Sequence, residues 1–212
     1  MFELSTRNEQ KWFIQLLNNT RWYDVWKTMN EVKPIHLIPG LNMMTVYQLS
    51  EYFEVPIRLI RNIENKHHLG DQITRKYIQG DEFSFLALNK KKVMFEGVQH
   101  WQYDFRDFSI HMASAGAICY SPQLVEEFLP YIRGSKICSD IIRKLIKGFD
   151  FDYYSYLGIN LLNKKLLDFE KNEAKIAYEK AREAETKRIV DSVLADIKIE
   201  QLPISVEVMV RI

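Results

Sequence analysis

Residues 45–66 read TVYQLSEYFEVPIRLIRNIENK and contain two short helical patterns separated by one tight break. Thr45 is a preferred N-cap for the first helix, and Pro56 has the fixed φ and the missing N–H that suit the first positions of the second. Apolar residues on one face of each pattern would meet in a shared core; they are Val46, Leu49, Phe53, Leu59, Ile60 and Ile63. With the small Ser50 at the helix crossing and Val55 in the turn, the pattern is typical of a helix-turn-helix.

The opposite face of the second helix is polar and basic, and it carries Ile57, Arg58, Arg61, Asn62, Asn65 and Lys66. An arginine donates two hydrogen bonds to a guanine edge, and an asparagine pairs with adenine, when such a helix lies in the major groove. Thr45, Lys66, Arg75 and Lys76 are placed to hold phosphates. We therefore expect this set to bind double-stranded DNA. The alternative is an ordinary helical hairpin with a solvated charged face.

Net charge limits how the chain can attract DNA. The 29 Lys and Arg residues and the 28 Asp and Glu residues nearly cancel, so no uniform positive field surrounds the protein. The main local excess falls between residues 56 and 76, where five basic residues face only Glu64 and Asp71. Any attraction to phosphates is therefore expected to be local to this segment.

A longer motif leads into the first helix of this segment. Its residues are Ile38, Pro39, Leu41, Met44, Thr45, Gln48, Leu49, Glu51, Tyr52, Phe53, Glu54 and Val55. They resemble the stretch that opens the helix-turn-helix in bacterial and phage-encoded antirepressor-like DNA-binding regulators. The resemblance implies a phage or mobile-element protein that regulates transcription. Glu54 departs from the pattern, because many such turns have glycine there, and Pro122-Gln123 replace a basic pair farther along.

The whole chain is expected to be mainly α with a small β component, an α+β class. Residues 1–40 form an N-terminal aromatic helical region, with apolar spacing that fits one broken helix or two short ones. The helix-turn-helix, possibly of the winged type, occupies residues 41–78, and a mixed α/β middle domain occupies 79–158. A long charged helix and a terminal strand follow at 159–212.

The middle domain is expected to begin with a small hairpin. Its strands would lie at residues 83–86 and 93–95, with the turn at 89–92. Residues 149–156 are rich in aromatic side chains, which would cover the edge of a core or meet a partner.

Three helices are predicted after the hairpin: one capped at Ser121-Pro122, one at residues 135–147, and a long charged one at 161–198. The last has an apolar seam formed by Leu162, Leu166, Phe169 and Ile176. We expect this seam to be the arm of a homodimer, which would place two DNA-binding helices on one face of the DNA. The alternative is a solvated helix braced against the body. Residues 204–212 alternate like a β-strand that needs a partner.

The side chains that carry catalysis or bind metals do not form a recognisable pattern. Possible soft metal ligands are Cys119, Cys138, His100 and His111, which lack Cys-x-x-Cys or His-x-x-x-His spacing. We therefore expect no enzyme, no cofactor and no metal site, with both cysteines in the core. Two cysteines are too few for a disulfide framework, and no apolar run approaches the length of a membrane span. These features favour the cytoplasm of a bacterial host cell.

The patterns together predict a non-enzymatic, sequence-specific DNA-binding transcriptional regulator of phage or mobile-element type. A competing hypothesis is an inhibitor or adaptor that uses the same fold to bind a host protein, for example an anti-defence protein. Near-neutral charge and the aromatic stretch at 149–156 would suit protein contacts. The two hypotheses differ in whether Arg58, Arg61 and Asn62 stay accessible or become buried against another chain.

Overall fold

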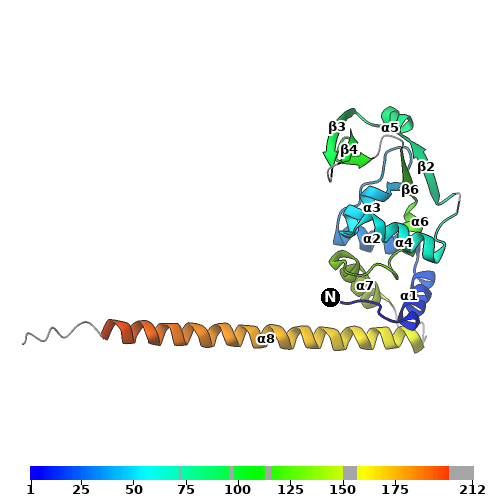
Figure 1. Ribbon diagram of the computed structural model, residues 1–212. Coiled ribbons are helices and arrows are strands. Elements are labelled where there is room, and N and C mark those ends of the chain that lie inside the picture. The colour runs from blue at the N-terminus through cyan, green and yellow to red at the C-terminus, as the bar shows by residue number, and fades with distance from the viewer. Residues whose placement is uncertain (72, 96–97, 113–115, 150–156, 201–212) are drawn as a thin grey trace, which may run out of the picture. The chain divides into compact units, whose positions relative to one another are not determined.

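The computed structural model describes residues 1–71, 73–95, 98–112, 116–149 and 157–200 of the chain (Figure 1). Over these residues the protein is mixed α+β, with eight helices and two three-stranded antiparallel sheets. This composition agrees with the class predicted from the sequence. The chain divides into two compact units, Met1–Leu166 and Leu167–Ile212.

Two helices open the first unit, α1 (Arg7–Asn19) and α2 (Trp22–Val32). Thr6 caps α1 in a capping box with Glu9, whose carboxylate also accepts a hydrogen bond from Lys165 Nζ at 2.8 Å. The backbone is extended at Thr20 and Arg21, which ends one helix before the next begins. Of the two arrangements that the apolar spacing allows, the chain therefore adopts two short helices.

Helices α3 (Val46–Phe53) and α4 (Ile57–His67) lie where the sequence predicts two helices. Thr45 caps α3 as expected: its Oγ1 accepts a hydrogen bond from Gln48 N at 3.1 Å, and Gln48 Oε1 accepts one from Thr45 N at 2.9 Å. The facing apolar side chains are buried; they are Val46, Leu49, Phe53, Ile60 and Ile63. Leu59, which was expected in the same core, is only half-buried.

The turn between α3 and α4 is tight although it contains no glycine. Glu54 adopts the left-handed conformation, with φ 55° and ψ 45°, which costs a non-glycine residue roughly 1–2 kcal/mol. Val55 N donates to Ser50 O at 3.0 Å and closes the end of α3. Lys33 Nζ lies beside this turn, where it donates to Glu51 O at 2.9 Å and lies 3.1 Å from Glu54 Oε1.

The first sheet lies beside these helices and is built from segments far apart in sequence. Its strands are β1 (Met44–Thr45), β6 (Gly116–Tyr120) and β2 (Arg75–Gln79), in that spatial order. Gly116 pairs with Gln79 and has φ 129°, and a Cβ at Gly116 would lie 2.2 Å from Ile78 O. Only glycine fits at this point, where the central strand begins.

The described residues between β2 and β6, 80–95 and 98–112, form a small second layer that shares a hydrophobic core with the first sheet. It contains helix α5 (Gly80–Leu86) and a second sheet of β3 (Asn89–Phe95), β4 (Val98–Asp104) and β5 (Ser109–Met112), in the order β3-β4-β5. The predicted hairpin is wrong in its first strand and its turn: residues 83–86 are helical, and residues 89–92 lie within β3.

Two local features explain this difference. Asp81 and Glu82 fall in the first turn of α5, where the helix dipole favours negative charge, and Phe83 is buried. In β3, Lys90 and Lys92 point to the same face because strand residues alternate. Their Nζ atoms lie 4.5 and 5.3 Å from the ring centre of Trp101 on β4, so cation–π contacts add to the pairing of β3 with β4.

Helices α6 (Pro122–Glu127) and α7 (Lys136–Gly148) complete the core of the first unit. Ser121 Oγ accepts a hydrogen bond from Leu124 N at 3.3 Å, and Ser135 Oγ accepts one from Cys138 N at 3.0 Å. Both helices therefore begin where the sequence predicts.

Helix α8 (Leu157–Glu200) includes the long helix predicted at 161–198. Its first turns belong to the first unit, where Leu162 and Leu166 are buried. Gly158 also lies so close to Trp12 that a Cβ would come within 2.1 Å of the indole. This corrects the predicted dimerisation seam, because two of its four residues already pack within their own chain.

The second unit contains the remainder of α8. Phe169 is half-buried and Ile176 is 51% exposed. Further apolar side chains along this part are also exposed; they are Leu167, Tyr178, Ile189, Val190, Val193 and Leu194. The strand predicted at 204–212 and the aromatic positions 150–156 lie outside the described residues.

Replacing Glu54 with glycine is expected to stabilise the fold by up to about 1 kcal/mol, because glycine adopts the left-handed conformation without steric cost. The ion pair with Lys33 that is lost is largely exposed and contributes little. Urea unfolding followed by circular dichroism measures the change.

Glu51→Gly is the matched control, since it removes the same side chain from a helical position of α3. It should destabilise the protein by about 1 kcal/mol. Equal destabilisation by both variants would contradict the left-handed turn at Glu54.

Candidate nucleic-acid interface

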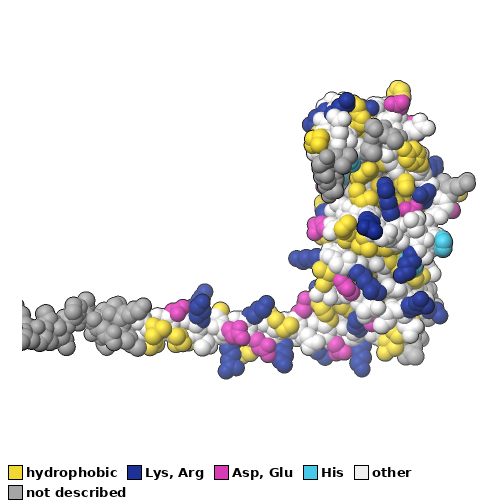
Figure 2. All heavy atoms as spheres, in the orientation of Figure 1, with side chains coloured by type: hydrophobic (Ala, Val, Ile, Leu, Met, Phe, Trp, Pro, Cys, Tyr) yellow, Lys and Arg dark blue, Asp and Glu magenta, His cyan; other side chains and the backbone are white. Residues whose placement is uncertain are grey.

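Helix α4 presents a polar, basic face to solvent. Arg58, Arg61, Asn62, Asn65 and Lys66 are all exposed, whereas Ile57 is half-buried. These residues recur at three- and four-residue steps, so they share one side of the helix while Ile60 and Ile63 anchor the other. Figure 2 shows Lys and Arg side chains gathered on the face of the molecule that carries α4.

The three residues expected to hold phosphates from outside α4 have different surroundings. Thr45 is fully buried and its hydroxyl caps α3, so the prediction that it contacts phosphate is wrong. Arg75 forms an ion pair with Glu64, which offsets its charge. Lys76 is exposed on β2. Of the two cations predicted on β2, Lys76 is thus the one with no carboxylate partner among the described residues.

Glu64 is the buried acidic side chain at this site, with 5% of its surface exposed. Its Oε1 accepts a hydrogen bond from Arg75 Nε, and its Oε2 accepts one from Tyr120 Oη at 2.8 Å. Burial raises the pKa of Tyr120 well above its ordinary value, and the Glu64 carboxylate adds to the shift, so Tyr120 remains a donor. Charged hydrogen bonds thus tie α4 to β2 and β6.

The sequence indicates that Glu64 is a buried carboxylate that needs a partner, although Glu64 was not among the predicted site residues. Glu64 follows Ile60 by four residues and Ile63 by one, so helical spacing places it at the edge of the buried side of α4. An acidic residue at such a position needs a partner, and a buried carboxylate without one is costly. Helical spacing alone, however, does not identify Arg75 and Tyr120 as the partners.

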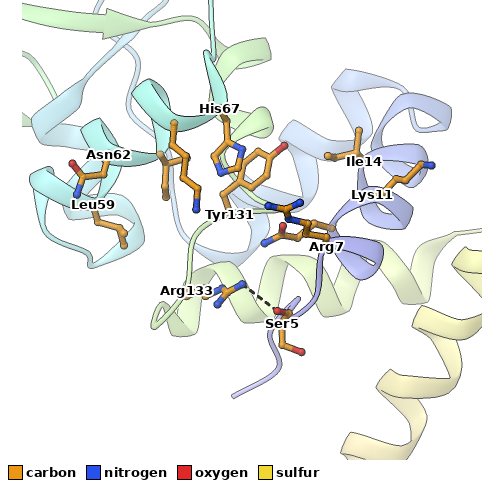
Figure 3. Close-up of a pocket in the computed structure, with 12 residues that line it drawn as sticks. Ser5, Arg7, Lys11, Ile14, Leu59, Asn62, His67, Tyr131 and Arg133 are labelled. Carbon is orange, nitrogen blue, oxygen red and sulfur yellow. Dashed lines mark hydrogen bonds between the residues drawn. The ribbon is translucent and has the colours of Figure 1, made fainter.

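A basic groove of about 800 Å³ lies along one flank of α4 (Figure 3). Side chains from α1 line one side, side chains from α4 line the other, and Tyr131 and Arg133 come from the segment between α6 and α7. Its charged lining residues are Arg7, Lys11, Lys66 and Arg133, and none of its lining residues is acidic. Arg7, Lys11 and Arg133 were not among the predicted site residues, because they lie far from α4 in sequence.

A smaller groove of about 350 Å³ lies along the opposite flank of α4, toward the first sheet. Arg61 and Asn65 line it from the helix, and Arg75 and Tyr77 line it from β2. Glu64 also contributes to this groove. The exposed face of α4 is therefore a ridge with a groove on each side.

His67 lies at the end of α4 within the larger groove. Its ring stacks on Tyr131 with centroids 3.7 Å apart. Burial lowers the pKa of His67 below its ordinary value, and the neighbouring Lys66 and His68 lower it further. The imidazole is therefore mainly neutral at pH 7, and it adds hydrogen-bonding capacity to the groove rather than charge.

Metal and thiol chemistry finds no support in the described part of the chain. No three His, Cys, Asp or Glu side chains come together there as a metal site would require. Cys119 and Cys138 are buried free thiols, as expected for core residues, and burial raises the pKa of Cys119 to about 12. Among the described helices, none is both long enough and apolar enough to cross a membrane.

Comparison with known proteins gives no relative. No protein-family model, no curated protein and no solved structure matches this chain. The resemblance to antirepressor-like regulators therefore stays a prediction based on the motif before α3.

Tyr120→Phe is expected to lower the free energy of unfolding by about 1.5–3 kcal/mol, the range for a hydrogen bond to a charged group. The physical reason is that the buried Glu64 carboxylate loses one of its two partners. Chemical denaturation at pH 7 measures the change.

Tyr77→Phe, on β2, removes a hydroxyl from a side chain that is 54% exposed. It should change stability by less than about 0.5 kcal/mol. If Tyr120→Phe were as mild as this control, Glu64 would not depend on the Tyr120 hydroxyl.

Proposed function

We propose that this protein is a sequence-specific DNA-binding regulator that places α4 in the major groove of double-stranded DNA. The observation that carries the proposal is the exposed face of α4, where Arg58, Arg61 and Asn62 stand on a helix whose other side is buried. Arginine and asparagine are the side chains that read guanine and adenine edges. A helix anchored on its far side presents them in one fixed geometry.

The arrangement around α4 supports a helix-turn-helix. Residues 54–56 join α3 to α4, and Val55 is buried in the turn between them. The chain order α2, β1, α3, α4, β2, β6 and the sheet order β1-β6-β2 support the winged form, in which two strands follow the second helix. In such an arrangement the layer that contains α5, β3, β4 and β5 stands in place of the wing.

Phosphate contacts in this proposal come from exposed cations beside the α4 ridge. Lys66 lies in the last turn of α4, and Lys76 lies on β2. Backbone contacts of this kind hold a protein in register on the duplex, while the side chains of α4 discriminate between bases. The motif before α3 supports a regulatory role, since it resembles that of antirepressor-like regulators.

We also propose that the second unit joins two copies of the chain into a homodimer. Ile176, Val190 and Leu194 are 51%, 49% and 51% exposed. Together with Phe169 they fall on heptad positions of one seam, in which the remaining positions are charged: Glu173, Lys180, Glu183 and Lys187. An isolated helix gains most of its stability by packing an apolar face. A second copy offers the same seam, and a dimer would supply two α4 helices for two half-sites.

Arg58→Ala and Arg61→Ala are each expected to weaken binding to the target DNA by about 1–3 kcal/mol, because each removes a bidentate contact to a base. Fluorescence anisotropy with DNA from the region upstream of the protein's own gene, and with random-sequence DNA, measures the loss. Binding to random DNA should fall much less.

Arg21→Ala is the matched control, since Arg21 is an exposed arginine at the start of α2 that pairs with Asp24. Its affinity should equal that of the wild type. Binding that is indifferent to sequence and to both α4 substitutions would rule out base recognition by α4. A search for a protein partner would then follow.

The double variant Val190→Glu/Leu194→Glu is expected to be monomeric in light scattering at micromolar concentration, because it places charge in the apolar seam. Wild-type protein should be dimeric under the same conditions. Ser192→Glu serves as the control, since Ser192 lies on the other side of the helix. A monomeric wild type would refute the arm and leave α8 as a solvated helix.

A further inference from the structure

The basic groove between α1 and α4 concentrates positive charge from three separate segments. Arg7 and Lys11 come from α1, Lys66 comes from α4, and Arg133 comes from the connection between α6 and α7. All four side chains are exposed. No ion pair to any of them occurs within the residues that the structure describes.

Some other cations of the same unit do have a carboxylate partner. Lys33, Lys144 and Lys165 each lie within 4 Å of a carboxylate, at 3.1, 3.6 and 2.8 Å. In the groove, by contrast, the lining contains no carboxylate that could offset the charge. Like charges held along low-dielectric walls repel one another and focus a positive potential, which attracts anions.

The position of the groove indicates which anion it suits. Asn62 and Lys66 belong both to the exposed ridge of α4 and to the groove lining. A helix that enters the major groove, about 12 Å wide, has one phosphodiester strand on each side. The strand on the α1 side would run along this groove. Cations spread over three segments and a volume of about 800 Å³ fit consecutive phosphates better than a single small anion.

We propose that this groove binds the sugar-phosphate backbone of one strand of the DNA that α4 enters. The inference rests on the proposed function and adds α1 and the α6–α7 connection to the interface. Arg7 and Lys11 lie one helical turn apart, so they share a face of α1. Arg133 is held in place because its Nη2 donates to Ser5 O at 3.2 Å (Figure 3).

Contacts of this type have a distinct signature, because phosphates carry no sequence information. Loss of a phosphate contact weakens binding to every sequence by a similar factor. It also makes the logarithm of affinity less dependent on the logarithm of salt, by about 0.9 for each phosphate that is no longer neutralised. Loss of a base contact from α4 instead lowers specificity and leaves the salt dependence nearly unchanged.

The test uses the full chain and the triple variant Arg7→Gln/Lys11→Gln/Arg133→Gln. Anisotropy titrations with the upstream DNA and with a random-sequence duplex are made between roughly 50 and 200 mM salt. We expect affinity for both DNAs to fall by a similar factor, of at least about tenfold at the lowest salt, and the salt slope to decrease by about 2–3. Lys27→Gln, an exposed lysine on α2 outside the groove, should match the wild type.

The double variant Arg7→Gln/Lys11→Gln keeps the Arg133–Ser5 contact, so it tests the groove without disturbing that anchor. On a logarithmic scale, its loss of affinity and the decrease of its salt slope should each be about two-thirds of those of the triple variant. Thermal unfolding of each variant checks that the fold is retained.

Three outcomes would count against the groove. If the wild type binds and the α4 variants lose specificity, but the triple variant keeps the wild-type affinity and salt slope, the groove proposal is overturned and the proposed function stands. A triple variant that loses only sequence discrimination also overturns it. If the wild type binds neither DNA at the lowest salt, the proposed function and the groove proposal both fail.

Discussion

The carboxylate of Glu64 links helix α4 to strands β2 and β6 of the first sheet. It lies on α4 and is held by Arg75 from β2 and Tyr120 from β6, the latter 56 residues away in sequence. Removing one partner of such a buried group is costly, because the charge would be left without compensation. The orientation of α4, and with it the direction in which its polar face points, therefore depends on the first sheet. The proposed DNA-binding surface is a property of the whole first unit rather than of two helices.

The layer that contains α5, β3, β4 and β5 is compatible with the first sheet because the chain enters and leaves this layer at neighbouring positions of the sheet. Gln79 and Gly116, which flank it, are paired neighbours on β2 and β6. The inserted helix and sheet thus begin and end at one point, and the strands that hold Glu64 keep their register. The close approach of Gly116 to Ile78 O shows how tightly this point is packed.

In the first unit, burial and ion pairing decide which of the predicted phosphate-binding side chains remain available at the surface. Glu64 removes Arg75 from the set of uncompensated cations, and the fully buried Thr45 is occupied in capping α3. What remains is a ridge of polar side chains on α4 with a strongly basic groove beside it. A protein with net charge +1 can in this way maintain a local positive potential without a basic surface overall. The residues proposed to read bases and those proposed to bind the backbone are then adjacent groups that share Asn62 and Lys66.

Signals within a few turns of chain were sufficient to predict most of the helices of this protein. Thr45, Ser121 and Ser135 mark helix starts, and apolar spacing identifies α3, α4 and α7, because capping and amphipathicity act between residues three or four apart. The same signals failed at residues 83–92, where short apolar runs fit a helix or a strand equally well until the core selects one. Only the tertiary structure decided that Thr45, Leu162 and Leu166 are buried and that Arg133 meets Ser5 across 128 residues. Burial and pairing at such separations depend on how whole elements pack, and no local pattern encodes that.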